Sequence, residues 1–76
     1  MSRWTREHDR DRYDHAEHLN LICAPYWWVM WSPSLRLYIA FYRGRARIGP
    51  LRHGDPGRLL DLMRHAAHAA ARGRPP

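Results

Sequence analysis

The chain has 76 residues, of which 45% are hydrophobic and 12% aromatic, and its formal net charge is +6. A chain of this length buries only about 60% of the surface of its unfolded state, which allows one small core and excludes a second domain. Its longest apolar run, from Leu21 to Trp31 with Pro25 inside it, falls short of the ~20 residues that span a bilayer, so we expect no membrane span.

The charge is unevenly distributed along the chain. Residues 1–20 hold four arginines and five acids, whereas residues 21–76 hold nine arginines and two acids, and there is no lysine. This asymmetry predicts either an anionic partner, which would be nucleic acid or an acidic protein, or a tail that shields the charge of the same chain. The single cysteine, Cys23, excludes an internal disulfide, and no apolar signal-peptide core stands at the N-terminus. We therefore expect a cytoplasmic protein.

The N-terminal segment, residues 1–20, is polar. Its composition is compatible with disorder, but opposite charges such as Glu7 and Arg10 are spaced as on a helix, and we favour a helix from about Thr5 to Leu19. We expect residues 21–73 to form the compact domain and residues 74–76 to be a tail.

Two strands follow, at residues 26–31 and 35–42, with Ser32-Pro33-Ser34 as the turn between them. In the first strand, Trp27, Val29 and Trp31 share one face. In the second, the alternation of side chains gives two faces, an apolar one (Leu35, Leu37, Ile39 and Phe41) and a mixed one (Arg36, Tyr38, Ala40 and Tyr42). A weaker third strand is predicted over residues 45–48, ended by Gly49-Pro50.

The C-terminal helix is the clearest element. Asp55 is a good N-cap, Pro56 suits the first helical position, and Gly73 with Pro75 ends the helix after Arg72. The predicted class is therefore α+β: a small antiparallel hairpin or three-stranded meander packed by this helix. We expect the helix to cover the Leu35/Leu37/Ile39/Phe41 face. The mixed face is then left uncovered, unless the N-terminal segment or a second copy of the chain covers it.

The predicted functional surface combines aromatic and basic side chains. Bases of single-stranded nucleic acid stack on aromatic side chains while arginines contact the phosphates. The candidate nucleic-acid-binding residues are Arg36, Tyr38, Tyr42, Arg43, Arg45, Arg47 and Arg52. We therefore predict a small, non-enzymatic nucleic-acid-associated or regulatory protein. The alternative is a protein–protein adaptor or homodimeric module, in which the aromatic residues are core or dimer contacts and the arginines form a solvated edge.

Other chemistries have weaker support. The pattern Asp-x3-His-Ala-x-His occurs twice, at Asp11/His15/His18 and at Asp61/His65/His68, and on a helix each set projects from one side as metal ligands would. Chance matches among six histidines and the neighbouring arginines argue against a metal, and we predict no metal and no cofactor.

Cys23, Ser32 and Ser34 show no nucleophile–base spacing, so no enzyme is predicted. The C-terminal helix lacks tryptophan, which argues against binding to a membrane surface.

The Trp-rich hairpin and the helix that begins at Asp55-Pro56, with its Leu59-Leu60-x-Leu62-Met63 sequence, also suggest a relationship. Over residues 26–64 the chain resembles small uncharacterised proteins of high-GC actinobacteria. The resemblance supports the α+β fold and a cytoplasmic setting, and it implies no particular activity.

Overall fold

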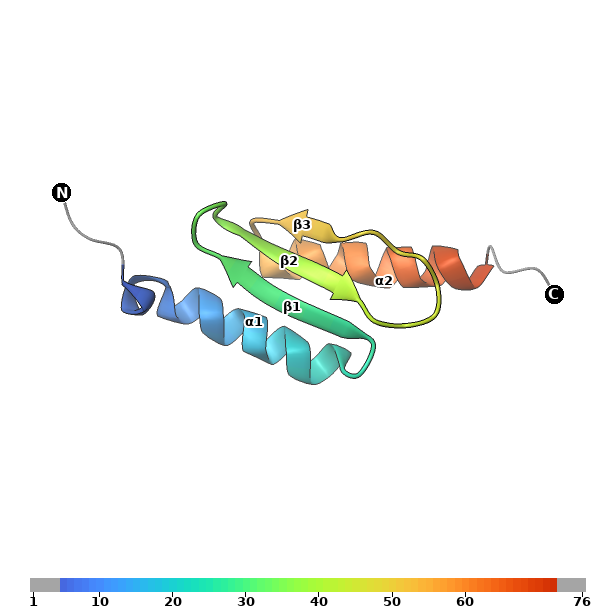
Figure 1. The fold of residues 1–76 in the computed structure, drawn as a ribbon, viewed down its shortest axis with the longest axis horizontal. Coiled ribbons are helices and arrows are strands. Elements are labelled where there is room, and N and C mark those ends of the chain that lie inside the picture. Colours follow the sequence, from blue (N-terminus) through green and yellow to red (C-terminus); the bar gives the residue numbers. More distant parts are fainter. Residues whose placement is uncertain (1–4, 73–76) are drawn as a thin grey trace.

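The computed structural model describes residues 5–72, and it forms one antiparallel sheet with two long helices (Figure 1). The elements in chain order are the 3₁₀ helix η1 (Arg6–Asp9), the helix α1 (Arg10–Cys23), the strands β1 (Trp27–Ser32), β2 (Leu37–Tyr42) and β3 (Leu51–His53), and the helix α2 (Pro56–Arg72). The predicted α+β class, a three-stranded antiparallel meander with a C-terminal and an N-terminal helix, is confirmed.

The strands lie in the order β1-β2-β3. In the register of the sheet, Trp28 is opposite Phe41, Val29 is opposite Ala40, and Ala40 is opposite Leu51. The prediction of a third strand over residues 45–48 is wrong, because β3 begins only after Pro50. The second strand also begins later than predicted, at Leu37, since the turn continues through Arg36.

The C-terminal helix has the predicted bounds, Pro56–Arg72. Its N-cap is Asp55, whose Oδ2 accepts a hydrogen bond of 2.8 Å from the backbone N–H of Arg58. This bond satisfies one of the amide groups that a helix N-terminus leaves without a partner inside the helix. The predicted stop at Gly73 and Pro75 and the tail, residues 74–76, lie outside the described residues.

The N-terminal helix α1 begins later than predicted, at Arg10 after η1, and it also ends later, at Cys23. It therefore crosses the boundary that we placed at residue 20. Ala16 and Leu19 of α1 are buried in the same core as the strands and α2. Within the part of the chain that the structure describes, α1 thus belongs to the compact domain.

Both helices pack on the same face of the sheet. α1 lies along β1, α2 packs on β3 and β2, and the helices also contact each other (Figure 1). The buried core consists of Ala16, Leu19, Trp27, Val29, Trp31, Tyr38, Ala40, Leu59 and Met63.

The face that the helices cover is not the one that we predicted. Tyr38 is only 1% exposed, and Tyr42 is half-buried against Trp27, with the ring centroids 5.0 Å apart. Both strands carry large apolar side chains on both faces, so alternation alone does not decide between the faces. At the centre of the covered face, however, the small side chains of Val29 and Ala40 are paired, which leaves room for the helices to approach.

Candidate functional site

The face of the sheet opposite the helices remains uncovered and is mainly apolar. We call it the open face, and it consists of Trp28, Met30, Leu37, Ile39, Phe41 and Arg52. Trp28 is 52% exposed, Met30 41% and Phe41 38%. Trp28 and Phe41 lie directly opposite each other on neighbouring strands, and so do Met30 and Ile39. The exposed aromatic pair of the sheet is therefore Trp28 and Phe41, whereas Tyr38 and Tyr42, the predicted site residues, lie on the covered face.

Arginines border the open face on two sides. Arg52 is opposite Ile39 and exposed, so it lies on the open face itself. Arg43 follows Phe41 by two residues, and its backbone N–H donates to the carbonyl of Tyr26 at 2.6 Å. The side chain of Arg43 therefore continues the same face of β2. Arg43 thus lies beyond Phe41 along β2, and Arg52 lies on the neighbouring strand β3, opposite Ile39.

Further arginines lie on the segment that leads from β2 to β3. We call residues 43–47 the arginine loop. Arg43, Arg45 and Arg47 are exposed, while Gly44 and Ala46 between them are half-buried. Among the described residues, none of these three arginines forms an ion pair within 4.0 Å. Their charges are therefore available to an anionic ligand.

Arg36 has a different environment from the other candidate arginines. It ends the β1–β2 turn with a φ of 57°, in the left-handed region. Its guanidinium binds both carboxylate oxygens of Asp9, at 2.7 and 2.9 Å, and lies over the ring of Trp31. Asp9 is 3% exposed and also accepts a hydrogen bond from the indole of Trp31 at 2.9 Å. Arg36 therefore anchors the N-terminal segment to the hairpin.

Tyr38 and His15 form a second polar contact between α1 and the sheet. The phenol oxygen of Tyr38 lies 3.3 Å from Nδ1 of His15. Burial raises the pKa of the Tyr38 phenol above its ordinary value, and the nearby charge of Arg12 opposes this shift. A buried phenol with a raised pKa stays protonated at neutral pH. The contact is therefore suited to holding α1 on β2 rather than to nucleophilic chemistry.

The remaining catalytic and metal candidates do not converge. Within residues 5–72, no group of three or more His, Cys, Asp or Glu side chains is placed to hold a metal ion, and neither Asp-x3-His-Ala-x-His segment forms such a group. Ser32 ends β1 and Ser34 lies in the turn that follows, where the Oγ of Ser32 accepts a hydrogen bond from the N–H of Leu35. Burial raises the pKa of the Cys23 thiol, and the charge of Arg64 opposes this shift. The raised pKa lowers the reactivity of the thiol, because less of the reactive thiolate is present.

The open-face residues Trp28, Met30 and Phe41 were not among the site residues predicted from the sequence. The signal for them was the pairing of two small residues, Val29 and Ala40, on the opposite face, which marks the side where helices can approach closely. Asn20 was not predicted either; its carboxamide hydrogen-bonds to the backbone of Val29 at the outer edge of β1. A single polar residue near the end of a helix does not indicate in the sequence that it will bind the edge of a strand.

No helix in the described part of the chain is both long and apolar enough to cross a membrane. Comparison with models of protein families, with curated proteins and with solved structures gives no match.

Proposed function

We propose that the protein is a non-enzymatic binding protein that takes single-stranded nucleic acid on its open face. The observation that supports this proposal is the exposed pair of Trp28 and Phe41, flanked by Arg43 and Arg52. A cytoplasmic and regulatory role fits such a protein, because nucleic acid is accessible there and the single thiol, Cys23, needs no oxidising compartment.

The chemistry of the open face suits unpaired bases. Aromatic rings on neighbouring strands offer stacking surfaces to successive bases, and each stacked base contributes about 1–3 kcal/mol to binding. Arg43 and Arg52 lie on the same face as these rings, and Arg45 and Arg47 extend the positive charge beyond the end of β2. Duplex bases are not available for stacking, so single strands are the expected ligand.

A second candidate function is supported by the aliphatic part of the same face. Met30, Leu37 and Ile39 make the centre of the open face continuous and apolar. Exposed apolar patches of this kind commonly mark protein–protein interfaces. A homodimer or an adaptor that binds a partner protein through the open face is therefore the alternative.

Fluorescence anisotropy with labelled single-stranded and duplex oligonucleotides tests the first proposal. We expect W28A and F41A each to weaken single-strand binding by about 1–3 kcal/mol, because each removes one stacking surface. The matched control is L62A, which removes an exposed apolar side chain from α2 and should leave binding unchanged.

Salt dependence provides the second readout. For single strands, log K falls with log salt by about 0.7 for each phosphate contact, so R45Q should reduce the slope by about 0.7. R58Q on α2 is the control and should leave the slope as it is. Absence of binding at low salt, together with a dimer or partner complex that W28A and F41A disrupt, would replace the nucleic-acid proposal by the protein-binding alternative.

A further inference from the structure

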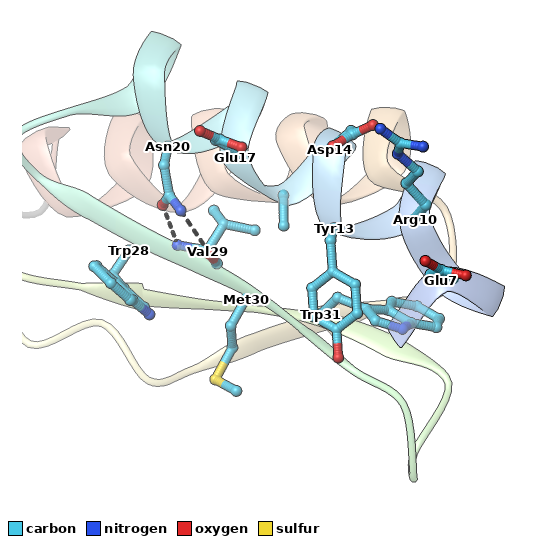
Figure 2. A pocket seen from close by; sticks show the side chains of 11 residues that line it. Glu7, Arg10, Tyr13, Asp14, Glu17, Asn20, Trp28, Val29, Met30 and Trp31 are labelled. Carbon is cyan, nitrogen blue, oxygen red and sulfur yellow. Dashed lines mark hydrogen bonds between the residues drawn. The ribbon is translucent and has the colours of Figure 1, made fainter. Parts of the chain in front are cut away.

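A groove of about 760 Å³ runs between α1 and the outer edge of β1 (Figure 2). Ala16 and Val29 line it from the two sides, and Trp28 and Met30 form part of its wall. Figure 2 shows Asn20 at one end of the groove, where its side chain binds Val29. This volume is in the range of cavities that hold small ligands or side chains of a partner.

The charge around the groove is opposite to that of the rest of the protein. Glu7, Asp14 and Glu17 line it, against one base, Arg10, whereas residues 21–76 hold nine arginines and two acids. An acidic rim above an apolar and aromatic wall suits a guanidinium, whose aliphatic stem packs on apolar groups and whose charged plane stacks on an aromatic ring.

The arginine loop of the same molecule does not occupy this groove. Gly44 and Ala46 line a second pocket together with Ala67, Ala70 and Ala71 of α2. Ile48, just after the loop, packs against the core. The loop thus faces its own α2 across this second pocket. It lies at the end of the sheet where β2 ends (Figure 1), and its three arginines are exposed.

We propose that the groove of one molecule binds the arginine loop of a second copy. The complementary charges lie on different surfaces of the chain, so the contact is heterologous and joins molecules head to tail into rings or open chains. The loop offers three exposed guanidinium groups with only small residues between them, which lets their stems enter a narrow groove. The groove shares Trp28 and Met30 with the open face, but the contact joins two different surfaces, whereas a symmetric dimer through the open face joins two copies of the same surface. The proposal does not depend on the proposed nucleic-acid function.

Charge-swapped variants test this proposal by sedimentation velocity in the absence of nucleic acid. Wild-type protein should associate as its concentration rises, and association should weaken with added salt. The groove variant D14R/E17R and the loop variant R45E/R47E should each weaken association by at least about tenfold, because each places like charges together. An equimolar mixture of the two variants should associate again, since each groove then meets a loop of opposite charge.

The controls separate the proposed contact from general effects of charge and from the open face. D11R/D61R adds the same charge as D14R/E17R at exposed acids outside the groove and should associate as the wild type does; circular dichroism checks the folding of every variant. A wild-type protein that stays monomeric at all concentrations would overturn the proposal. Association that survives both charge reversals but is lost in I39E would also overturn it, because the open face would then be the interface.

Discussion

At the scale of single residues, Gly44 and Tyr42 set the path of the arginine loop. The phenol ring of Tyr42 folds back over Gly44, and a Cβ at position 44 would overlap this ring. Gly49, at the other end of the connection, has open space around its Cβ position. Neither glycine has a positive φ. Position 44 therefore requires glycine because the Tyr42 ring leaves no space for a side chain, and not because of the backbone conformation.

Substitution of each glycine by alanine should change the free energy of unfolding by different amounts. We expect G44A to lower the free energy of unfolding by about 1–3 kcal/mol, because the Tyr42 ring must leave its position against Trp27. G49A should change it by no more than about 1 kcal/mol. Urea denaturation measures both values, and equal effects of the two substitutions would show that Tyr42 does not constrain the loop.

The environment of Arg36 could not be predicted from its neighbours in the sequence. The alternation of the second strand placed it beside Tyr38 on an exposed face. Its actual role depends on Asp9, which lies 27 positions away in the sequence and becomes its partner only when α1 packs on the hairpin. The ion pair and the stacking on Trp31 offset a left-handed backbone that costs about 1–2 kcal/mol for a residue other than glycine. No local pattern carries this information.

At the scale of elements, Asn20 protects the free edge of β1. Its side-chain amide donates to the carbonyl of Val29 at 2.8 Å, and its oxygen accepts from the Val29 N–H at 2.5 Å. The carboxamide thus occupies both outward-facing backbone groups of Val29, as a residue of a further strand would. An exposed edge is a site of unwanted strand pairing, and this contact from α1 covers the middle of it.

Hydrogen exchange of the Val29 amide tests this role. In the wild type we expect slow exchange, although Val29 lies on an edge strand. N20A should remove both hydrogen bonds, lower the free energy of unfolding by about 1–3 kcal/mol and expose this amide. H18A on the exposed side of α1 serves as the control. Unchanged protection of the Val29 amide in N20A would show that something other than Asn20 shields the edge.

Elements with strong local signals could be predicted from the sequence, and those that depend on tertiary contacts could not. The bounds of α2 follow from Asp55 as N-cap, Pro56 at the first position and the spacing of Leu59 and Met63. β3 was misplaced because exposed arginines and half-buried residues alternate from Arg43 to Ile48 as in a strand, although this segment does not pair with β2. Leu51 becomes part of a strand only through its partner Ala40.

At the scale of the whole molecule, the fold places two helices on one side of a sheet that is apolar on both sides. Sequence periodicity identified both apolar faces but assigned the C-terminal helix to the wrong one. The candidate site therefore moved from Tyr38 and Tyr42 to Trp28 and Phe41. The side chains of Arg43, Arg45, Arg47 and Arg52 are exposed. The uncovered face and its basic border together define the surface that we propose to be functional.

The most direct test of this account uses the methyl groups of two methionines as reporters. Met30 lies exposed on the open face, and Met63 is buried between α2 and the sheet. In NMR spectra of protein labelled at the methionine methyl groups, titration with a single-stranded oligonucleotide should shift the Met30 signal and leave the Met63 signal in place. A titration that saturates binding while the Met30 signal stays unchanged would contradict the claim that the open face is the binding surface.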